Sequence, residues 1–91
     1  MSERHPYEIR ITHRAEKDIK KLSPRLKDKL YDILTEVIAK DPHIGKKLIG
    51  DLEGSFSYRL TYQDRIVYSI DEKHRIIYVE RARTHYDIPR H

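Results

Sequence analysis

Hydrophobic and polar residues alternate along the second half of the chain in three runs, at 56–62, 65–70 and 75–83. Period-two alternation of aromatic and β-branched residues is typical of strands with one buried face. The polar breaks between the runs are short, and short connections join antiparallel neighbours. The runs therefore predict an antiparallel meander of three strands. In the first strand, four residues are predicted to share the buried face: Phe56, Tyr58, Leu60 and Tyr62.

The first half of the chain changes to a helical period. Residues 7–12 alternate as a further strand, and apolar residues then recur at three- and four-residue spacing from Ala15 to Leu22. This spacing predicts an amphipathic helix, for which Thr12 or His13 is the expected cap.

A second, longer helix is predicted from Pro24 to Lys40. Ser23 is a typical N-cap, proline is favoured at the first helical position, and an apolar stripe continues to Ile38. Asp41 precedes a proline, and a residue in that position avoids helical geometry, so the helix ends there.

Together these elements predict a single α+β domain over residues 1–91, with the order β-α-α-β-β-β. The two helices form a hairpin that packs on one face of a small, mainly antiparallel sheet. The segment 43–54 holds all three glycines and is predicted to be irregular.

Composition and charge narrow the class of protein. The chain has a net charge of +4 and no cysteine. A basic domain of this size suits a polyanionic partner such as nucleic acid, the ribosome or an acidic protein, although such a charge also serves plain solubility. No apolar run is long enough to span a bilayer, and the N-terminus lacks the apolar core of a signal peptide. The sequence therefore predicts a cytoplasmic protein that does not contact a membrane.

Arginines gather on the sheet face that the predicted helices leave open. By alternation this face carries Arg59 and Arg65. On the last strand Arg81 and Arg83 share a parity with Ile77 and Val79, and a bulge near the end of the strand would change which arginine faces in. Guanidinium groups match the geometry of phosphate with paired donors and stay charged at any relevant pH. The pattern predicts a phosphate site, and its alternative is a solvated face whose arginines pair with carboxylates such as Glu80.

His85 and Tyr86 follow the last predicted strand. RNA cleavage through the ribose 2′-hydroxyl needs a base, a cation for the developing charge and an acid for the leaving oxygen. One histidine and a few arginines supply all three roles without a metal or cofactor. By itself, a histidine beside a tyrosine is more often an ordinary surface feature. The sequence has no HExxH-type pair or carboxylate cluster, so no metal site is predicted.

Four short strings resemble the RelE/ParE superfamily of bacterial toxins: KLIGDLEG from Lys47, YRL from Tyr58, DRIVY from Asp64 and RTHY from Arg83. The similarity covers nearly the whole chain, and its ending resembles the YoeB-type branch. The resemblance implies the toxin of a type II toxin–antitoxin pair. Such a toxin forms a hetero-oligomer with a small antitoxin protein and, when free, cleaves mRNA on the ribosome.

The resemblance also implies roles for individual residues. Arg65 matches the strand arginine that contacts the scissile phosphate, and Arg59 matches a basic residue on the preceding strand. Arg83 matches the arginine near the end of the last strand. His85 matches the general acid or base proposed for the YoeB-type branch, and Tyr86 matches its aromatic neighbour.

The chain departs from the YoeB-type branch in two places. Lys46 stands where that branch has a catalytic glutamate, so the role of base passes to His85 or to a lysine. The chain also continues for five residues after Tyr86. Lys46, Lys47 and Arg81 complete the expected substrate-binding set.

Two other functions are compatible with the same scaffold. A ParE-type toxin inhibits DNA gyrase without nuclease activity, but that branch generally lacks a histidine after its last strand, so His85 favours the nuclease. The third alternative is a module that only binds an antitoxin.

Overall fold

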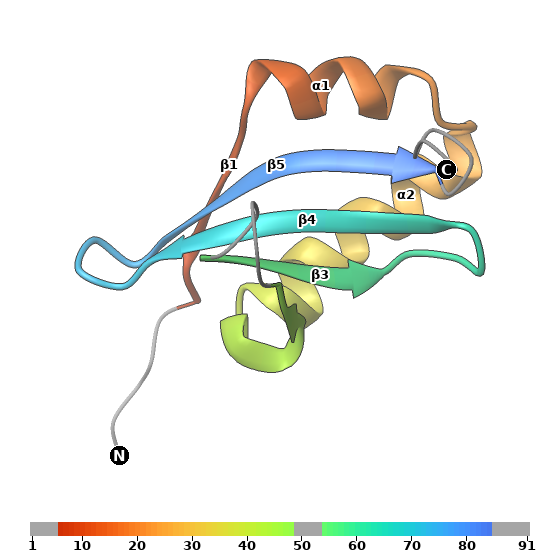
Figure 1. Cartoon of the computed structure of the whole chain (residues 1–91). Coiled ribbons are helices and arrows are strands. Elements are labelled where there is room, and N and C mark those ends of the chain that lie inside the picture. Colours follow the sequence, from red (N-terminus) through yellow and green to blue (C-terminus); the bar gives the residue numbers. More distant parts are fainter. Residues whose placement is uncertain (1–5, 49–53, 85–91) are drawn as a thin grey trace.

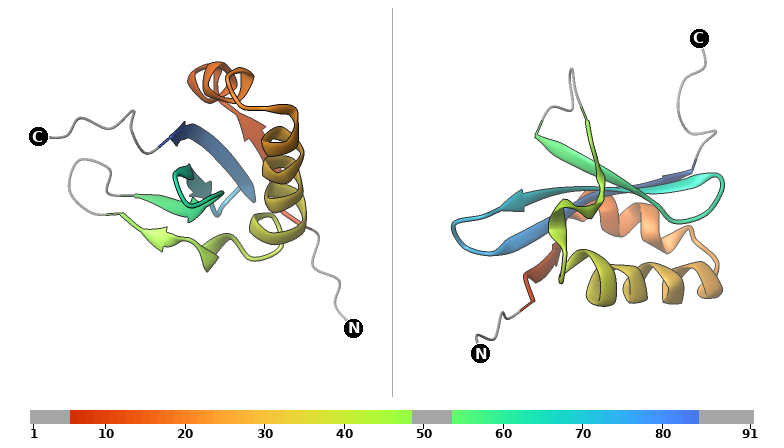
Figure 2. Two further views of the ribbon diagram at one scale, coloured as in Figure 1. Left: turned by 90° about the vertical axis from the view of Figure 1, so that its right-hand side faces the viewer. Right: turned by 90° about the horizontal axis from the view of Figure 1, so that it is seen from below.

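The structure, a computed structural model, describes residues 6–48 and 54–84. Two helices pack on one face of a five-stranded sheet with the strand order β1-β5-β4-β3-β2 (Figure 1). The strands are β1 (Glu8–Ile11), β2 (Lys46–Lys47), β3 (Ser55–Arg59), β4 (Asp64–Asp71) and β5 (Ile76–Thr84). β1 is parallel to β5 and all other neighbours are antiparallel. The predicted α+β fold is confirmed, and Figure 2 shows both helices on the same side of the sheet.

The helices begin at the predicted caps. α1 (His13–Lys20) begins after Thr12, whose hydroxyl accepts a hydrogen bond from the Ala15 N–H at 3.2 Å. α2 (Pro24–Ile33) begins after Ser23, whose hydroxyl accepts from the Leu26 N–H at 3.3 Å. These side chains satisfy N–H groups that have no partner within the first helical turn.

The second predicted helix changes its winding before it ends. After Ile33 the chain enters η1 (Leu34–Ile38), a π-helical segment in which the Ala39 N–H donates to the Leu34 carbonyl. A π-turn adds one residue to the helical repeat, so the predicted helix over 24–40 is α2 followed by this wider segment. Apolar spacing does not distinguish the two windings.

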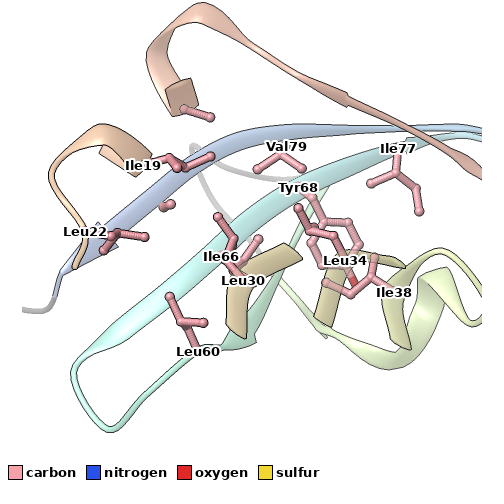
Figure 3. Close-up of a cluster of buried hydrophobic side chains, with 12 residues drawn as sticks. Ile19, Leu22, Leu30, Leu34, Ile38, Leu60, Ile66, Tyr68, Ile77 and Val79 are labelled. Carbon is pink, nitrogen blue, oxygen red and sulfur yellow. The ribbon is translucent and has the colours of Figure 1, made fainter. Parts of the chain in front are cut away.

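The core lies between the helices and the sheet (Figure 3). Leu30, Leu34 and Ile38 contribute from the helical side, opposite sheet residues such as Ile77. Among the sheet residues is Tyr68, whose hydroxyl donates to the Pro42 carbonyl at 2.7 Å and accepts from the Gly45 N–H at 3.0 Å. Burial raises the pKa of Tyr68 to about 12, so this hydroxyl stays protonated. A Cβ at position 45 would collide with it, which is why glycine is needed there.

Two sequence predictions about the sheet are wrong. The segment predicted to be irregular contains β2, which pairs with β3 and extends the sheet by a strand. Tyr62 does not share the buried face but is 89% exposed, whereas Leu60 is buried. The chain turns after Arg59: the Thr61 hydroxyl accepts from the Asp64 N–H at 2.9 Å and donates to the Asp64 carboxylate at 3.0 Å. This polar turn ends the strand alternation early and places Tyr62 at its tip.

No helix in the described ranges is long and apolar enough to cross a membrane.

Candidate phosphate-binding face

The strand register brings three arginine positions into one row across the sheet. Arg65 in β4 lies directly opposite Arg59 in β3 on one side and Arg83 in β5 on the other. Like charges at directly opposite positions of a sheet repel each other unless an anion lies between them. The Arg59 and Arg65 side chains are exposed, and within residues 6–48 and 54–84 neither has a carboxylate partner. The row is therefore a candidate site for an anion.

A β-bulge accounts for the position of the last arginines. Without a bulge, Arg81 and Arg83 would share the face of Ile77 and Val79, which are fully buried in the core. The register between β4 and β5 shifts between Val67 and Tyr68, which leaves one residue of β5, Glu80, without an opposite partner. After the shift, Ala82 occupies the core position opposite Ile66. Positions 81 and 83 therefore no longer belong to the core face of the strand.

Arg81, expected to bind substrate, is engaged elsewhere. Its guanidinium group donates to both carboxylate oxygens of Asp18 in α1, at 2.8 and 3.2 Å. Asp18 also accepts from the Ala82 N–H at 3.0 Å. β1 pairs with β5 only as far as Val79, so the outer edge of β5 beyond that point needs another partner. Asp18 provides it, and this Asp18–Arg81 clamp attaches α1 to the end of β5.

The two expected lysines lie on opposite faces of the sheet edge. Both are exposed in β2, where Lys46 is opposite Ser57 and Lys47 is opposite Phe56. Directly opposite residues share a face of a sheet. Lys46 therefore lies on the arginine face and Lys47 on the face of the core.

Glu80 is a functional candidate that the sequence suggested only as a partner for an arginine. Its carboxylate accepts from the Ser55 hydroxyl at 3.0 Å and from the Ser69 hydroxyl at 2.9 Å. Ser55 and Ser69 are opposite each other, and they alternate with the core residues Phe56 and Tyr68. The carboxylate thus lies on the arginine face. Alternation alone could not find it, because its orientation depends on the bulge.

His85 and Tyr86 lie outside the described residues. β5 ends at Thr84, immediately before them, and Arg83 lies in the arginine row. Their assignment to the site stays a prediction. In the described part of the chain, no group of His, Cys, Asp and Glu residues is arranged to hold a metal ion.

Among the hollows lined by described residues, two lie beside the sheet. One, of about 650 Å³, separates α2 from the turn between β3 and β4 and is lined by Arg59, Tyr58 and the exposed Tyr62, among others. The other, of about 540 Å³, lies at the far end of β4 and is lined by Tyr7, His43 and Glu72, among others. Of these two, the first adjoins the arginine row, since Arg59 belongs to both.

Comparison with known proteins identifies the family. Residues 9–90 match the model of the ParE-like toxin of type II bacterial toxin–antitoxin systems. Toxin RelE of Mycobacterium tuberculosis is 34% identical over 90 residues, which cover 94% of this chain and 92% of that protein.

Solved structures agree with this match. In the toxin–antitoxin complex RelBE2 from Mycobacterium tuberculosis, one chain has a TM-score of 0.80 and 31% identity, covering 87% of this chain and 91% of that one. A chain of the intact RelBE toxin–antitoxin complex from E. coli has a TM-score of 0.74, with coverage of 92% and 99%; at 21% identity, this likeness is one of fold. The chain is a toxin of the RelE/ParE superfamily and belongs to the ParE-like family of type II toxin–antitoxin systems.

Proposed function

We propose that this toxin is a ribosome-dependent mRNA endoribonuclease that is held inactive by a small antitoxin. The observation that carries the proposal is the row of arginine positions 59, 65 and 83, which spans three adjacent strands and has the exposed Arg65 at its centre. The relative named Toxin RelE supports a toxin function, and the solved RelBE toxin–antitoxin complexes support an antitoxin partner.

The proposed reaction uses the arginines of this face together with His85. A base removes the proton of a ribose 2′-hydroxyl, and the 2′-oxygen attacks the adjacent phosphorus. The bond from phosphorus to the 5′-oxygen breaks, an acid donates a proton to that oxygen, and a 2′,3′-cyclic phosphate remains. Arg65, flanked by Arg59 and Arg83, stabilises the negative charge that develops on the phosphoryl oxygens. His85 carries the protons, and no step requires a metal.

The antitoxin is expected to cover the same face. Exposed arginines and Lys46 give this face a positive charge, so an antitoxin segment with acidic side chains complements it. Binding there excludes RNA, which explains inhibition without any change of fold. Co-expression with the neighbouring reading frame, followed by co-purification, tests this part of the proposal.

The nuclease activity is tested on purified, programmed ribosomes, with the wild-type chain beside Arg65→Ala. Wild type should cut the message in the ribosomal A site, and Arg65→Ala should cut it far more slowly. Arg25→Ala, which removes an exposed arginine from α2, is the matched control and should cut normally. Intact messages together with gyrase-dependent DNA breaks in cells would overturn the proposal in favour of the gyrase inhibitor.

A further inference from the structure

Glu80 places a carboxylate on the same face of the sheet as the arginine row. Its two oxygens accept hydrogen bonds from the Ser55 hydroxyl at 3.0 Å and the Ser69 hydroxyl at 2.9 Å, so the carboxylate is held in one orientation. Glu80 is half-buried and stays within reach of solvent. Across residues 6–48 and 54–84, no cation lies within ion-pair distance of it. The described residues therefore orient this negative charge without neutralising it.

The bulge brings this charge over the middle of the sheet. Glu80 is the residue of β5 that has no opposite partner on β4, and β-bulges redirect side chains. Its side chain passes over β4 and reaches Ser55 on β3. A ligand that lies along the open face of these three strands therefore meets both the arginine row and the carboxylate.

The distance between these two charged groups keeps them independent. Ser55 and Ser69, which hold the carboxylate, lie four residues along their strands from Arg59 and Arg65, or about 13 Å at the rise of a strand. Charges on a solvated surface are screened over about 8 Å at physiological salt. Glu80 therefore does not neutralise the arginine row, and the open face carries one positive and one negative site.

A polyanion suits only the positive site. RNA carries a phosphate at every nucleotide, so a strand that crosses the carboxylate is repelled by it, and like charges brought together at an interface weaken binding. A protein segment carries side chains of both signs and complements both sites. The carboxylate therefore favours a protein ligand over RNA.

The free acceptor positions of the carboxylate indicate which cation fits. A carboxylate has about four acceptor positions, and each serine uses one of them, on a different oxygen. The remaining positions include one on each oxygen, and the two parallel N–H donors of a guanidinium group match such a pair. The ammonium group of lysine is a point charge and lacks this fit. The complementary cation is therefore an arginine.

We propose that the antitoxin binds Glu80 with an arginine side chain while its acidic side chains occupy the arginine row. This inference rests on the proposed covering of the arginine face by the antitoxin. The arginine and the nearest acidic residue should lie about four positions apart in an extended segment, or about nine in a helix. Glu80 is then a determinant of partner choice, because an antitoxin without this arginine leaves the covered carboxylate unpaired.

The test uses the antitoxin that co-purifies with this chain and measures its dissociation constant by calorimetry. Glu80→Gln keeps the size of the side chain but removes its charge, and it should weaken antitoxin binding by about tenfold or more. Ser69→Ala should weaken binding less, because it only loosens the carboxylate. Glu16→Gln, an exposed change on α1, is the matched control and should bind as wild type does. Cleavage on programmed ribosomes by free Glu80→Gln should not fall, which also shows that this variant is folded.

A double-mutant cycle locates the partner of Glu80. Each arginine and lysine of the antitoxin is changed to alanine in turn and titrated against wild type and Glu80→Gln. One arginine should matter for wild type and lose its effect in Glu80→Gln. Wild-type affinity of Glu80→Gln, or the absence of any coupled arginine, would overturn the inference.

The same titrations separate this inference from the proposed function. Arg65→Ala should also weaken antitoxin binding, and equal binding by Arg65→Ala and wild type would mean that the antitoxin covers another face, which would overturn both. A coupled arginine at Glu80 without any cleavage of mRNA by the free chain would support the inference and count against the nuclease alone.

Discussion

The two ends of the β4–β5 hairpin differ in how their charged side chains are paired. At one end, Arg59 and Arg65 lie opposite each other, and no carboxylate of the described residues pairs with either. At the other end, Glu72 accepts hydrogen bonds from the Tyr7 hydroxyl at 2.8 Å and from His43 at 2.7 Å. There the guanidinium carbon of Arg75 lies 4.3 Å from the centre of the Tyr7 ring.

The difference indicates what each end does. Charged groups that pair with one another stabilise the folded protein, and they have few free hydrogen-bonding positions for a ligand. Charges that repel one another cost stability and are retained where an external anion pairs with them. The paired end therefore supports the fold, whereas the arginine end is where RNA and antitoxin are expected to compete. Substitutions separate these roles, because a change at the arginine end should affect cleavage and one at the paired end should affect only stability.

The largest effect is expected from His85, which directly follows the end of β5. His85→Gln keeps the size and polarity of the side chain but removes its ability to carry a proton at neutral pH. The rate of mRNA cleavage should fall by about 10²–10⁴. Binding to the ribosome should change little, because a mostly neutral imidazole neutralises little phosphate charge. Single-turnover cleavage, measured beside ribosome binding, tests this, and cleavage at the wild-type rate would transfer the proton-carrying role to a lysine or to Tyr86.

Arg65→Ala should reduce cleavage by about 10²–10³, the scale for the loss of one preorganised group that stabilises charge. Arg65→Lys should recover little of this loss, because a point charge does not reproduce the paired donors of guanidinium. The melting temperature of Arg65→Ala should be equal to or above that of wild type, since a repulsive pair has been removed. Thermal denaturation measures this, and a clear drop in melting temperature would show that Arg65 is a structural residue.

The Asp18–Arg81 clamp is a pair of charges that supports the fold, but it lies beside the arginine row. Asp18→Ala leaves the Ala82 N–H and the Arg81 guanidinium group without this carboxylate. The free energy of unfolding should fall by about 1–3 kcal/mol, the scale for a partly buried group that loses a hydrogen-bond partner. Cleavage per folded molecule should fall by less than an order of magnitude. Urea denaturation with Glu16→Ala on the same helix as control measures the stability, and equal stability of the two variants would contradict the clamp.

The smallest effect is expected at the paired end. The hydrogen bond from Tyr7 and then that from His43 hold the pKa of Glu72 below its usual value. A carboxyl group whose pKa is lowered by folding stabilises the fold above its unfolded pKa, and this contribution is lost as the pH falls through the folded pKa. The melting temperature of Glu72→Gln should therefore lie slightly below that of wild type at neutral pH. The difference should disappear in acid, below the ordinary pKa of a glutamate, and cleavage should be unchanged at neutral pH. A difference that grew on acidification would mean that the Glu72 contacts do not stabilise the fold.

Local sequence patterns determined most of the elements of this protein. Alternation in the runs beginning at Arg65 and Arg75 predicted two strands, because a side chain's face in an extended chain depends only on its position. Thr12 and Ser23 predicted the starts of both helices, because a cap needs a partner only two or three residues away. The arginines predicted a phosphate site, because the charge and donor geometry of a side chain belong to the residue type itself. The RTHY string carried information only through the resemblance to the toxin superfamily.

Tertiary structure decided how these elements form a site. The bulge at Glu80 is a property of the pairing between β4 and β5. Regular alternation along β5 alone would assign Arg81 and Arg83 to the core face. The pairing of Asp18 with Arg81 joins residues 63 positions apart, and no local pattern encodes such a contact. Faces and caps are set by near neighbours in the chain, whereas register, bulges and charge pairs are set by which strands and helices meet. For that reason the arginines could be identified from the sequence, but the row that they form, and the carboxylate beside it, could not.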